Sequence, residues 1–240
     1  MHRRSLPALI PDAAERADEF PWLEQLQDTI RSRMNQSRQP SGQDESTSLS
    51  ENYLREHTVG ELTPLSSPIR LVDYDSSWPC RFQVEARRIR TALGESALRI
   101  EHVGSTAVVD LPAKPIIDIV LVVADSANEA AYAAVLEGAG YRLHIRERGW
   151  HEHRLFKGPE NSVNLHVFTS GCPEIERMLE FRDWLRASRE DRELYARSKR
   201  ALAEQVWKYT QNYADAKSSV VGEIMLRARQ AKERGTGEAS

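Results

Sequence analysis

Two cysteines in 240 residues exclude several kinds of site at the outset. Cys80 and Cys172 are too few and too far apart for a zinc knuckle or a disulfide framework. Cys172 precedes a helix expected to begin at Pro173, where a thiol pKa can be lowered, but no His or Asn motif beside it indicates nucleophilic catalysis. We interpret Cys172 as a small residue in a tight loop.

Long apolar runs and an excess of positive charge are missing as well. No segment approaches the ~20 apolar residues that span a bilayer, and the apolar run after Arg3 and Arg4 is too short and proline-broken for a signal peptide. The net charge of -3 and pI near 6.2 give no general attraction to nucleic acid or anionic membranes. No phosphate-binding loop of the G-x-x-x-x-G-K-[ST] kind occurs, which excludes a P-loop kinase. We expect a soluble cytoplasmic protein with neither nucleic-acid nor membrane partners.

Residues 1–66 differ from the rest and are predicted to form an N-terminal extension. One amphipathic helix is expected there, and the segment "NQSRQPSGQDESTSLSEN" after it is too polar to order itself, so we interpret it as a linker. The apolar residues of that helix recur at helical spacing: Trp22, Leu23, Leu26, Ile30 and Met34. The main domain is predicted over 67–230, with a disordered tail at 231–240.

Within the main domain, strand patterns come first and helical patterns last. The segment "IRLVDYDSSWP" suggests a short strand, and "PCRFQVEARRIRTALG" a helix that ends at Gly94. The remaining strands are expected in "ALRIEHV", "IIDIVLVV", "YRLHIRE", "WHEHRLFKG" and "SVNLHVF", with a helix over Asp125–Gly140 and helices from Pro173 to about Lys232. This order predicts an α+β domain built around a mixed sheet.

Asp118 is the one carboxylate inside the apolar run "IIDIVLVV". An ionised carboxylate in an apolar interior costs several kcal/mol unless it is paired, and Lys114, His102 and His166 are its expected partners. The turn Gly104-Ser105 after the preceding strand suits a phosphate: glycine allows close approach and serine donates a hydrogen bond, while an acid on the next strand can hold Mg²⁺. The alternative is a structural pair that locks the turn.

Five of the seven histidines lie on or beside predicted strands: His102, His144, His151, His153 and His166. A subset of them with Asp118 could bind a divalent metal such as zinc, manganese or iron, and His151 and His153 are predicted to share a strand face. None has the HExxH spacing. The alternative is that they are hydrogen-bonded structural residues of the sheet.

Several basic residues lie where they could face the same cleft: Arg154, Lys157, Arg182, Lys199 and Lys217. We interpret most of them as solvated charges on amphipathic elements. Arg182 is the exception, because it lies on the apolar stripe of its helix and therefore needs an anion, from a neighbouring helix or from a ligand.

Five segments together resemble the GrpB family: "YDSSWPCRFQVEA", "IEHVGSTAVVDLPAKPIIDI", "EHRLFKG", "NLHVF" and "FRDWLRA". The family is also met as an accessory domain attached to some dephospho-CoA kinases. It resembles the nucleotidyltransferase superfamily, so the resemblance implies a nucleotidyltransferase-like mixed sheet flanked by helices, with C-terminal helices. It also implies an active site with a Gly-Ser turn after one strand and carboxylates on the next. Together with the residues singled out above, this predicts a nucleotide site formed by Gly104, Ser105, Thr106, Lys114 and Arg182, a catalytic Asp118, and a metal held by Asp118, His166 and His102.

The sequence departs from that pattern at the carboxylates. Two-metal transfer needs two acids at i and i+2 on one strand, but Val120 stands at the second position, and Asn164 and His166 stand where a third acid is expected. Val109-Asp110-Leu111 replaces the usual Val-Pro-Gly-Leu turn. We therefore expect a protein that binds a nucleotide or another phosphate-bearing small molecule, with Mg²⁺-dependent nucleotidyl transfer as its catalytic form. The alternative is a catalytically degenerate accessory or interaction domain; the sequence leaves the oligomeric state open.

Overall fold

The computed structural model describes residues 50–237 of the chain. By its internal contacts the chain divides into Met1–Tyr53 and Leu54–Ser240, and the second unit contains the β-sheet. The helix predicted around Trp22 and most of the polar linker lie outside the described residues. Residues 231–237, predicted to belong to the tail, are helical.

The second unit is built on one five-stranded mixed sheet in the order β1-β2-β5-β4-β3. Strand β2 pairs antiparallel with β1 and parallel with β5, while β4 pairs antiparallel with both β5 and β3. The strand bounds are β1 Arg99–Val103, β2 Ile117–Val123, β3 Arg142–Glu147, β4 His153–Lys157 and β5 Val163–Thr169. This confirms the predicted mixed sheet flanked by helices.

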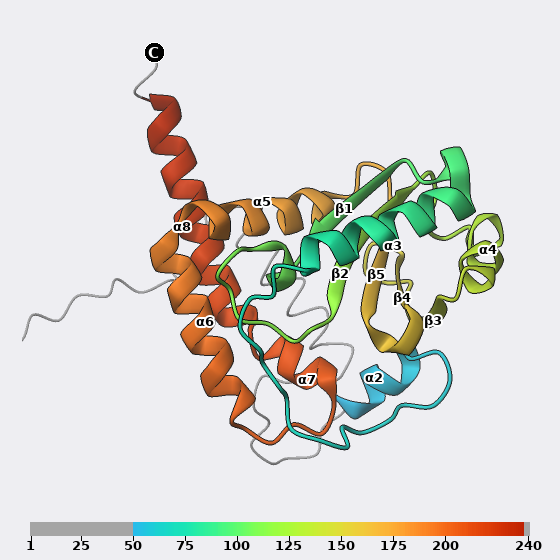
Figure 1. Ribbon diagram of the computed structural model, residues 1–240, viewed down its shortest axis with the longest axis horizontal. Coiled ribbons are helices and arrows are strands. Elements are labelled where there is room, and N and C mark those ends of the chain that lie inside the picture. The colour runs from blue at the N-terminus through green and yellow to red at the C-terminus, as the bar shows by residue number, and fades with distance from the viewer. Residues whose placement is uncertain (1–49, 238–240) are drawn as a thin grey trace, which may run out of the picture. The chain divides into compact units, whose positions relative to one another are not determined.

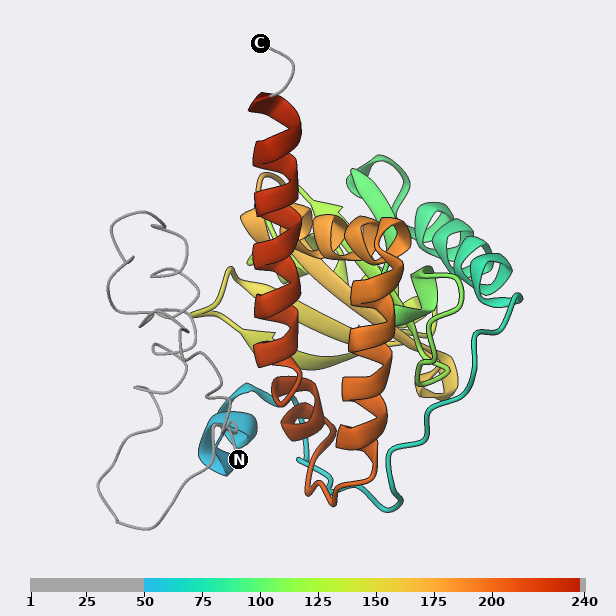
Figure 2. The same ribbon diagram turned by 90° about the vertical axis from the view of Figure 1, so that its left-hand side faces the viewer.

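Seven α-helices are described within residues 50–237 (Figure 1). They are α2 Glu51–His57, α3 Trp78–Leu93, α4 Ala133–Gly138, α5 Pro173–Ala187, α6 Arg189–Ala203, α7 Thr210–Asp215 and α8 Ser218–Gly237. Short 3-10 turns lie at Gly94–Ser96, Ser105–Ala107, Glu129–Ala131 and Pro159–Asn161. Helices α6 and α8 run side by side, as both Figure 1 and Figure 2 show.

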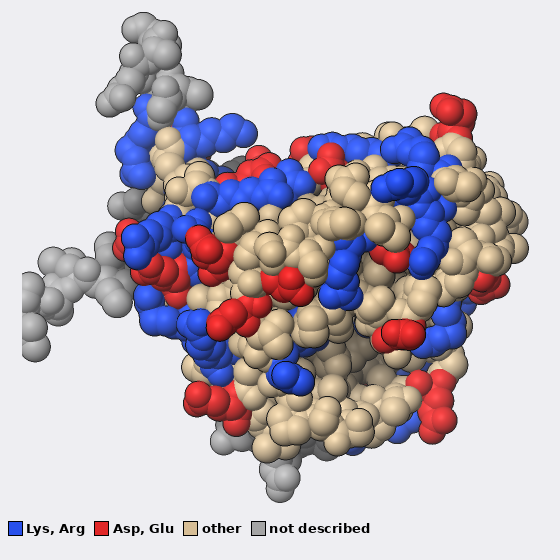
Figure 3. All heavy atoms as spheres, viewed as in Figure 1, with Lys and Arg blue, Asp and Glu red and all other residues tan. Residues whose placement is uncertain are grey.

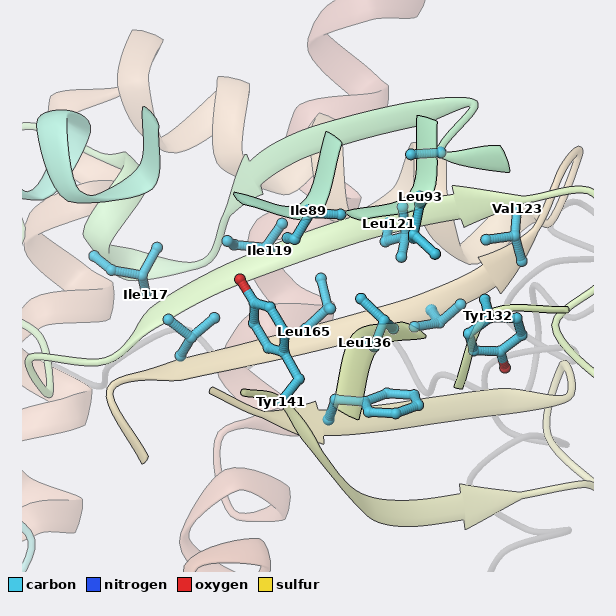
Figure 4. Close-up of a cluster of buried hydrophobic side chains, with 14 of the residues drawn as sticks. Ile89, Leu93, Ile117, Ile119, Leu121, Val123, Tyr132, Leu136, Tyr141 and Leu165 are labelled. Carbon is cyan, nitrogen blue, oxygen red and sulfur yellow. The ribbon is translucent and has the colours of Figure 1, made fainter. Parts of the chain in front are cut away.

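One face of the sheet packs against α3 and α4 and forms the main apolar core. Ile89 and Leu93 of α3 meet the odd-numbered residues of β2, among them Ile119 and Leu121 (Figure 4). Period-two alternation puts these β2 side chains on one face, while the 3.6-residue period of α3 presents its apolar stripe to them. Leu136 of α4 closes the same layer.

The opposite face carries the even-numbered β2 side chains and is covered only in part by α5. Val120 and Val122 pack with Ile175 and Leu179 of α5. Asp118 lies on this face too, beside the turn that follows β1. Helices α6 and α8 cover the loop beyond that turn, through contacts with Val108 and Leu111 among others.

Two predicted elements are shorter than expected. The strand expected near residue 70 reduces to a single bridge between Val72 and Ala113, because the next hydrogen-bonding position, opposite Arg70, is Pro115, which has no N–H to extend the ladder. The helix predicted over Asp125–Gly140 is confined to α4, since the Asp125 carboxylate accepts a hydrogen bond from the Ala127 N–H and favours a turn.

The prediction that His151 and His153 share a strand face was wrong. His151 precedes β4 and has a φ of 53°, as part of the tight turn that reverses the chain between β3 and β4. Among residues 50–237, no helix combines the length and apolar character needed to cross a bilayer.

Candidate functional site

The turn after β1 lies directly against Asp118. Gly104 has a φ of 69° and a ψ of -169°, a backbone conformation open in practice only to glycine. A Cβ on Gly104 would lie 2.5 Å from Asp118 Oδ2, so glycine is required by space as well. Strand pairing explains the approach, because Val103, the last residue of β1, lies opposite Asp118 on β2.

Asp118 is held by two side chains of β5, its parallel neighbour. Asn164 Nδ2 donates a hydrogen bond to Asp118 Oδ1 at 2.7 Å, and His166 Nε2 lies 3.9 Å from the same oxygen. Burial opposes ionisation of Asp118, but His166, Asn164 and Lys114 outweigh it and bring its pKa below the ordinary value. The carboxylate is therefore charged at neutral pH, as its pairing predicts.

Polar contacts extend from this carboxylate across the sheet in two directions, one through the hydrogen bond from Asn164 and one through the ion-pair contact with His166. On one side, Lys157 Nζ donates to Asn164 Oδ1 at 2.6 Å, which fixes the orientation of the amide that binds Asp118. On the other, His153 Nε2 lies 3.1 Å from His166 Nδ1, and His153 Nδ1 lies 2.7 Å from Glu147 Oε2. The histidines of this face thus link two carboxylates to each other.

A cavity of about 50 Å³ opens between the turn, Asp118 and the C-terminal helices. It has room for a few water molecules or one small polyatomic group. Its lining is mostly polar and comes from segments far apart in the chain: Leu71, Ser105, Thr106, Ala113, Lys114, Ile116, Asp118, Asn164, Lys199, Tyr213 and Lys217.

Three of these lining residues are lysines, and Lys157 adjoins them through Asn164. Lys199 Nζ contacts Ser105 Oγ at 2.9 Å and also donates to the Pro112 carbonyl oxygen. Lys114 and Lys217 lie against one Tyr213 ring, with their Nζ atoms 5.5 Å and 4.9 Å from its centroid. The amines of four lysines thus lie around one carboxylate.

Burial lowers the pKa values of all four lysines, and a neighbouring lysine adds to this for three of them. Burial and the neighbouring Lys217 lower the pKa of Lys199 to about 6 and that of Lys114 to about 8. Burial and the nearby Lys114 lower the pKa of Lys157 to about 8, and burial lowers the pKa of Lys217. Burial thus disfavours the protonated amines more than Asp118 favours them, and a further anion in the cavity would favour them.

The structure brings six of the eight predicted site residues together, with His166 beside Asp118, and separates the other two from them. Around the cavity lie Gly104, Ser105, Thr106, Lys114 and Asp118. His102 points to the opposite face of the sheet, where it stacks on Phe82 of α3 at 4.8 Å, because its strand partner is Ile119 and not Asp118. Its Nε2 contacts the Thr106 hydroxyl, and burial lowers its pKa to about 4.

Arg182 finds its anion within the protein. Its guanidinium binds Glu101 Oε2 at 3.0 Å, the His102 carbonyl oxygen at 2.9 Å and both oxygens of Asp183. Arg182 is therefore not a lining residue of the cavity. The anion expected for Arg182 is thus supplied by carboxylates of the protein itself, those of Glu101 and Asp183.

The donor set around the cavity suits an anion better than a divalent cation. No group of three His, Cys, Asp or Glu side chains is placed to hold a metal ion anywhere in residues 50–237. Near Asp118, His166 is the imidazole in reach, and His102 lies across the sheet. Mg²⁺ prefers oxygen ligands, and here the ammonium groups outnumber the carboxylates.

Comparison with known proteins matches residues 68–227 to the family model described as GrpB protein. The chain belongs to the GrpB family. It is 58% identical over 183 residues to a UPF0157 protein of Halalkalibacterium halodurans, a match that covers 76% of this chain and 94% of the relative. A UPF0157 protein of Streptomyces coelicolor is 45% identical, with 70% of this chain and 89% of the relative covered.

A solved GrpB structure and a longer enzyme resemble this GrpB protein as well. The crystal structure of GrpB from Enterococcus faecalis aligns with a TM-score of 0.59 and 28% identity, over 68% of this chain and 99% of that chain. A dephospho-CoA kinase of Mycolicibacterium paratuberculosis is 36% identical over 60% of this chain, but the match spans only 42% of the kinase. The shared segment is thus one part of that longer protein.

Three lysines of the site were interpreted from the sequence as solvated charges, and this was wrong for Lys157, Lys199 and Lys217. Lys199 is only 2% exposed and lies on α6 with the buried Tyr195 and Ala196. Its helical spacing from those residues is the signal that could have identified it. Lys217 and Lys157 carry no comparable signal, since only the fold brings them to the cavity.

Proposed function

We propose that this GrpB protein binds a phosphate-bearing small molecule, with the phosphate in the cavity beside the Gly104-Ser105 turn. The observation that supports this most is the convergence of Lys114, Lys199 and Lys217 on a space that holds one carboxylate. A phosphate dianion would supply the missing negative charge and accept hydrogen bonds from the ammonium groups and from a hydroxyl.

The distribution of charge favours a small ligand. On the face shown in Figure 3, Lys and Arg are interspersed with Asp and Glu. The net charge of the chain is -3, so the lysines at the cavity are a local excess and not part of a uniformly basic protein. A local cationic pocket attracts an anionic group without binding polyanions along the surface. A nucleotide is the ligand class that the family resemblance suggests.

Binding is proposed here without nucleotidyl transfer. A two-metal reaction requires paired carboxylates, and Val120 occupies the position two residues after Asp118. We assign Asp118 instead to orienting Asn164 and to holding the lysines around the cavity. An accessory role, as in the degenerate-domain alternative, does not exclude ligand binding. A binding experiment distinguishes a domain that binds the ligand from one that does not.

Thermal unfolding with inorganic phosphate, pyrophosphate or ATP tests the proposal. At a ligand concentration of about 100 times Kd the stabilisation is about 2.7 kcal/mol. For a domain of about 150–250 residues this raises Tm by about 5–10 °C. Potassium acetate at the same ionic strength is the control for salt effects.

Lysine variants give the test its specificity. Lys114→Met and Lys217→Met each remove one charge-assisted contact, worth about 1.5–3 kcal/mol, and should weaken binding by roughly 10- to 150-fold. Lys232→Met is the matched control, because Lys232 is 77% exposed on α8 and pairs with Glu180. Equal ligand affinity in all three variants, or no Tm shift in the wild type, would remove the proposal and leave the interaction-domain alternative.

A further inference from the structure

A serine hydroxyl and a buried amine meet at the rim of the cavity. Ser105 follows the sharp turn at Gly104 and begins a single 3-10 turn, Ser105–Ala107, at the end of β1. The hydroxyl of Ser105 lines the cavity and lies 2.9 Å from Lys199 Nζ.

The surroundings of Lys199 keep its amine in the form that accepts a proton. Lys199 is 2% exposed, its pKa is lowered to about 6, and it donates to the Pro112 carbonyl oxygen. Above that pKa the neutral amine has one lone pair, and Ser105 lies within hydrogen-bond distance to share it. Burial of an uncharged amine also avoids the cost of an isolated cation.

Tyr195 completes the group from one helical turn earlier on α6. Its buried hydroxyl interacts with Ser105, and its ring centroid lies 4.8 Å from Lys199 Nζ. Its pKa is raised by burial, so the phenol stays protonated and can donate a hydrogen bond. A nucleophile, a base and a third orienting group within hydrogen-bond reach are the requirements for nucleophilic catalysis.

We propose that Ser105 and Lys199 form a nucleophile and base that hydrolyse an ester whose acyl or alcohol part carries an anionic group. This activity goes beyond the proposed phosphate binding, and its test does not depend on it. Pairs of serine and lysine perform acyl transfer on folds unrelated to one another, so the chemistry requires only this geometry.

The reaction balances with water as the second substrate. Ser105 Oγ attacks the ester carbonyl carbon as its proton passes to Lys199 Nζ, and the carbonyl becomes an oxyanion. The carbon–oxygen bond to the alcohol then breaks, and the Lys199 ammonium returns the proton to the leaving oxygen. Water attacks the acyl-Ser105 ester in the same way, with Lys199 as the base, and releases the carboxylic acid and the free hydroxyl.

Two further cations suit the charges that this reaction develops. Lys114 and Lys217 line the same cavity and lie against the Tyr213 ring, where burial strengthens their field. An ammonium group near the carbonyl stabilises the oxyanion, and a second one holds the anionic group of the substrate. If Lys199 only anchored the turn through its contact with Ser105, Lys114 and Lys217 would have no part in that role.

Covalent labelling with an uncharged fluorophosphonate separates the two roles. In the reaction a bond forms between Ser105 Oγ and phosphorus, the phosphorus–fluorine bond breaks, fluoride leaves and the serine proton passes to Lys199. Intact-mass and peptide mass spectrometry should show one adduct, on Ser105. Ser105→Ala should abolish labelling, and Lys199→Met and Lys199→Arg should each slow it by about 100-fold or more, the low end of what a general base contributes.

Ser170→Ala and Lys232→Met are the matched controls, since both residues are exposed and lie outside the cavity. Labelling of the folded wild type should also rise as Lys199 loses its proton, in the field of Lys217, Arg200 and Asp118 around it. This profile needs no variant, so it holds even if the Lys199 variants unfold.

Three outcomes overturn the proposal: an unlabelled wild type, a label on another residue, or a Lys199 variant that folds and reacts at the wild-type rate. Failure of phosphate to bind the wild type, with Ser105 still labelled, would refute the proposed function and leave this one standing. Because the probe carries no charge, its reaction does not require the anion site. A wild type that binds phosphate but leaves Ser105 unlabelled would therefore refute this proposal and leave the proposed function standing.

Discussion

Replacing Gly104 with alanine tests whether the turn really lies against Asp118. Two costs are expected together. The backbone at Gly104, with a φ of 69°, strains any residue that carries a Cβ, at about 1–3 kcal/mol. The new methyl would also lie 2.5 Å from Asp118 Oδ2, and relieving such an overlap costs about 1–3 kcal/mol more. The unfolding free energy should therefore fall by about 2–6 kcal/mol.

Gly94→Ala is the matched control for the backbone cost alone. Gly94 has a φ of 54° and a ψ of -130°, but nothing lies within 4 Å of the Cβ it would gain. Its variant should lose only about 1–3 kcal/mol, which corresponds to about 2–12 °C in Tm for a domain of this size. The difference between the two variants measures the overlap with Asp118.

A double-mutant cycle with Asp118→Ala isolates that overlap. Asp118→Ala removes the nearest oxygen and leaves a Cβ at 3.0 Å, so the two substitutions should couple favourably by about 0.5–3 kcal/mol. Urea denaturation followed by tryptophan fluorescence supplies all four unfolding free energies. The reasoning is refuted if Gly104→Ala costs no more than Gly94→Ala, or if the two substitutions are additive.

Other predictions follow from the same contacts. Asn164→Ala should cost about 1–3 kcal/mol in urea denaturation, because it leaves Lys157 and Asp118 without the amide that joins them; an unchanged midpoint would contradict this. The pKa of Lys199 is lowered to about 6 from 10.5, so the unfolded state binds more protons between these values. The stability of the wild type should therefore rise with pH across that window more than that of Lys199→Met, and equal slopes in Tm against pH would be evidence against a buried neutral amine. Asp191→Ala should cost about 3–5 kcal/mol, since the buried Asp191 accepts hydrogen bonds from an indole N–H and an arginine; a loss under about 1 kcal/mol would show that this pairing contributes little.

The sequence predicted the sheet well because strand alternation is a local signal. All five segments that form β1 to β5 were identified, and the apolar run around Asp118 was correctly interpreted as a strand buried on both faces. Helix α3 begins at Trp78, one residue before its predicted start at Pro79, and proline favours the first helical turn. Shorter elements were less predictable, since turn-forming side chains such as Asp125 compete with helix there.

The site was predictable only where its residues share one motif. Gly104, Ser105 and Asp118 belong to neighbouring segments, and their meeting follows from antiparallel pairing of two strands. The pairing of β2 with β5 is parallel and joins residues 46 apart, so Asn164 was not foreseen as the partner of Asp118. His102 was misplaced because the strand register, which decides the face, cannot be read from one segment.

The charge of the cavity is the property that depends most on the tertiary fold. Lys199 and Lys217 come from the C-terminal helical region and meet Lys114 from the loop before β2. Helical spacing could have marked Lys199 as buried, but no pattern in the sequence predicts that lysines from three such segments converge on one cavity. Burial lowers the pKa values of all three lysines, and the neighbouring Lys217 lowers those of Lys114 and Lys199 further. The concentration of lysines is what makes the cavity suitable for an anion.

The most direct measurement is the position of a bound anion in crystals soaked with tungstate, a heavy analogue of phosphate. The account predicts an anomalous peak in the cavity, within hydrogen-bond distance of Ser105 Oγ and of the ammonium group of Lys114 or Lys217. Crystals of Lys114→Met should lose most of that peak. A cavity without tungstate, while the anion occupies surface arginines elsewhere, would contradict the claim that these lysines form an anion site.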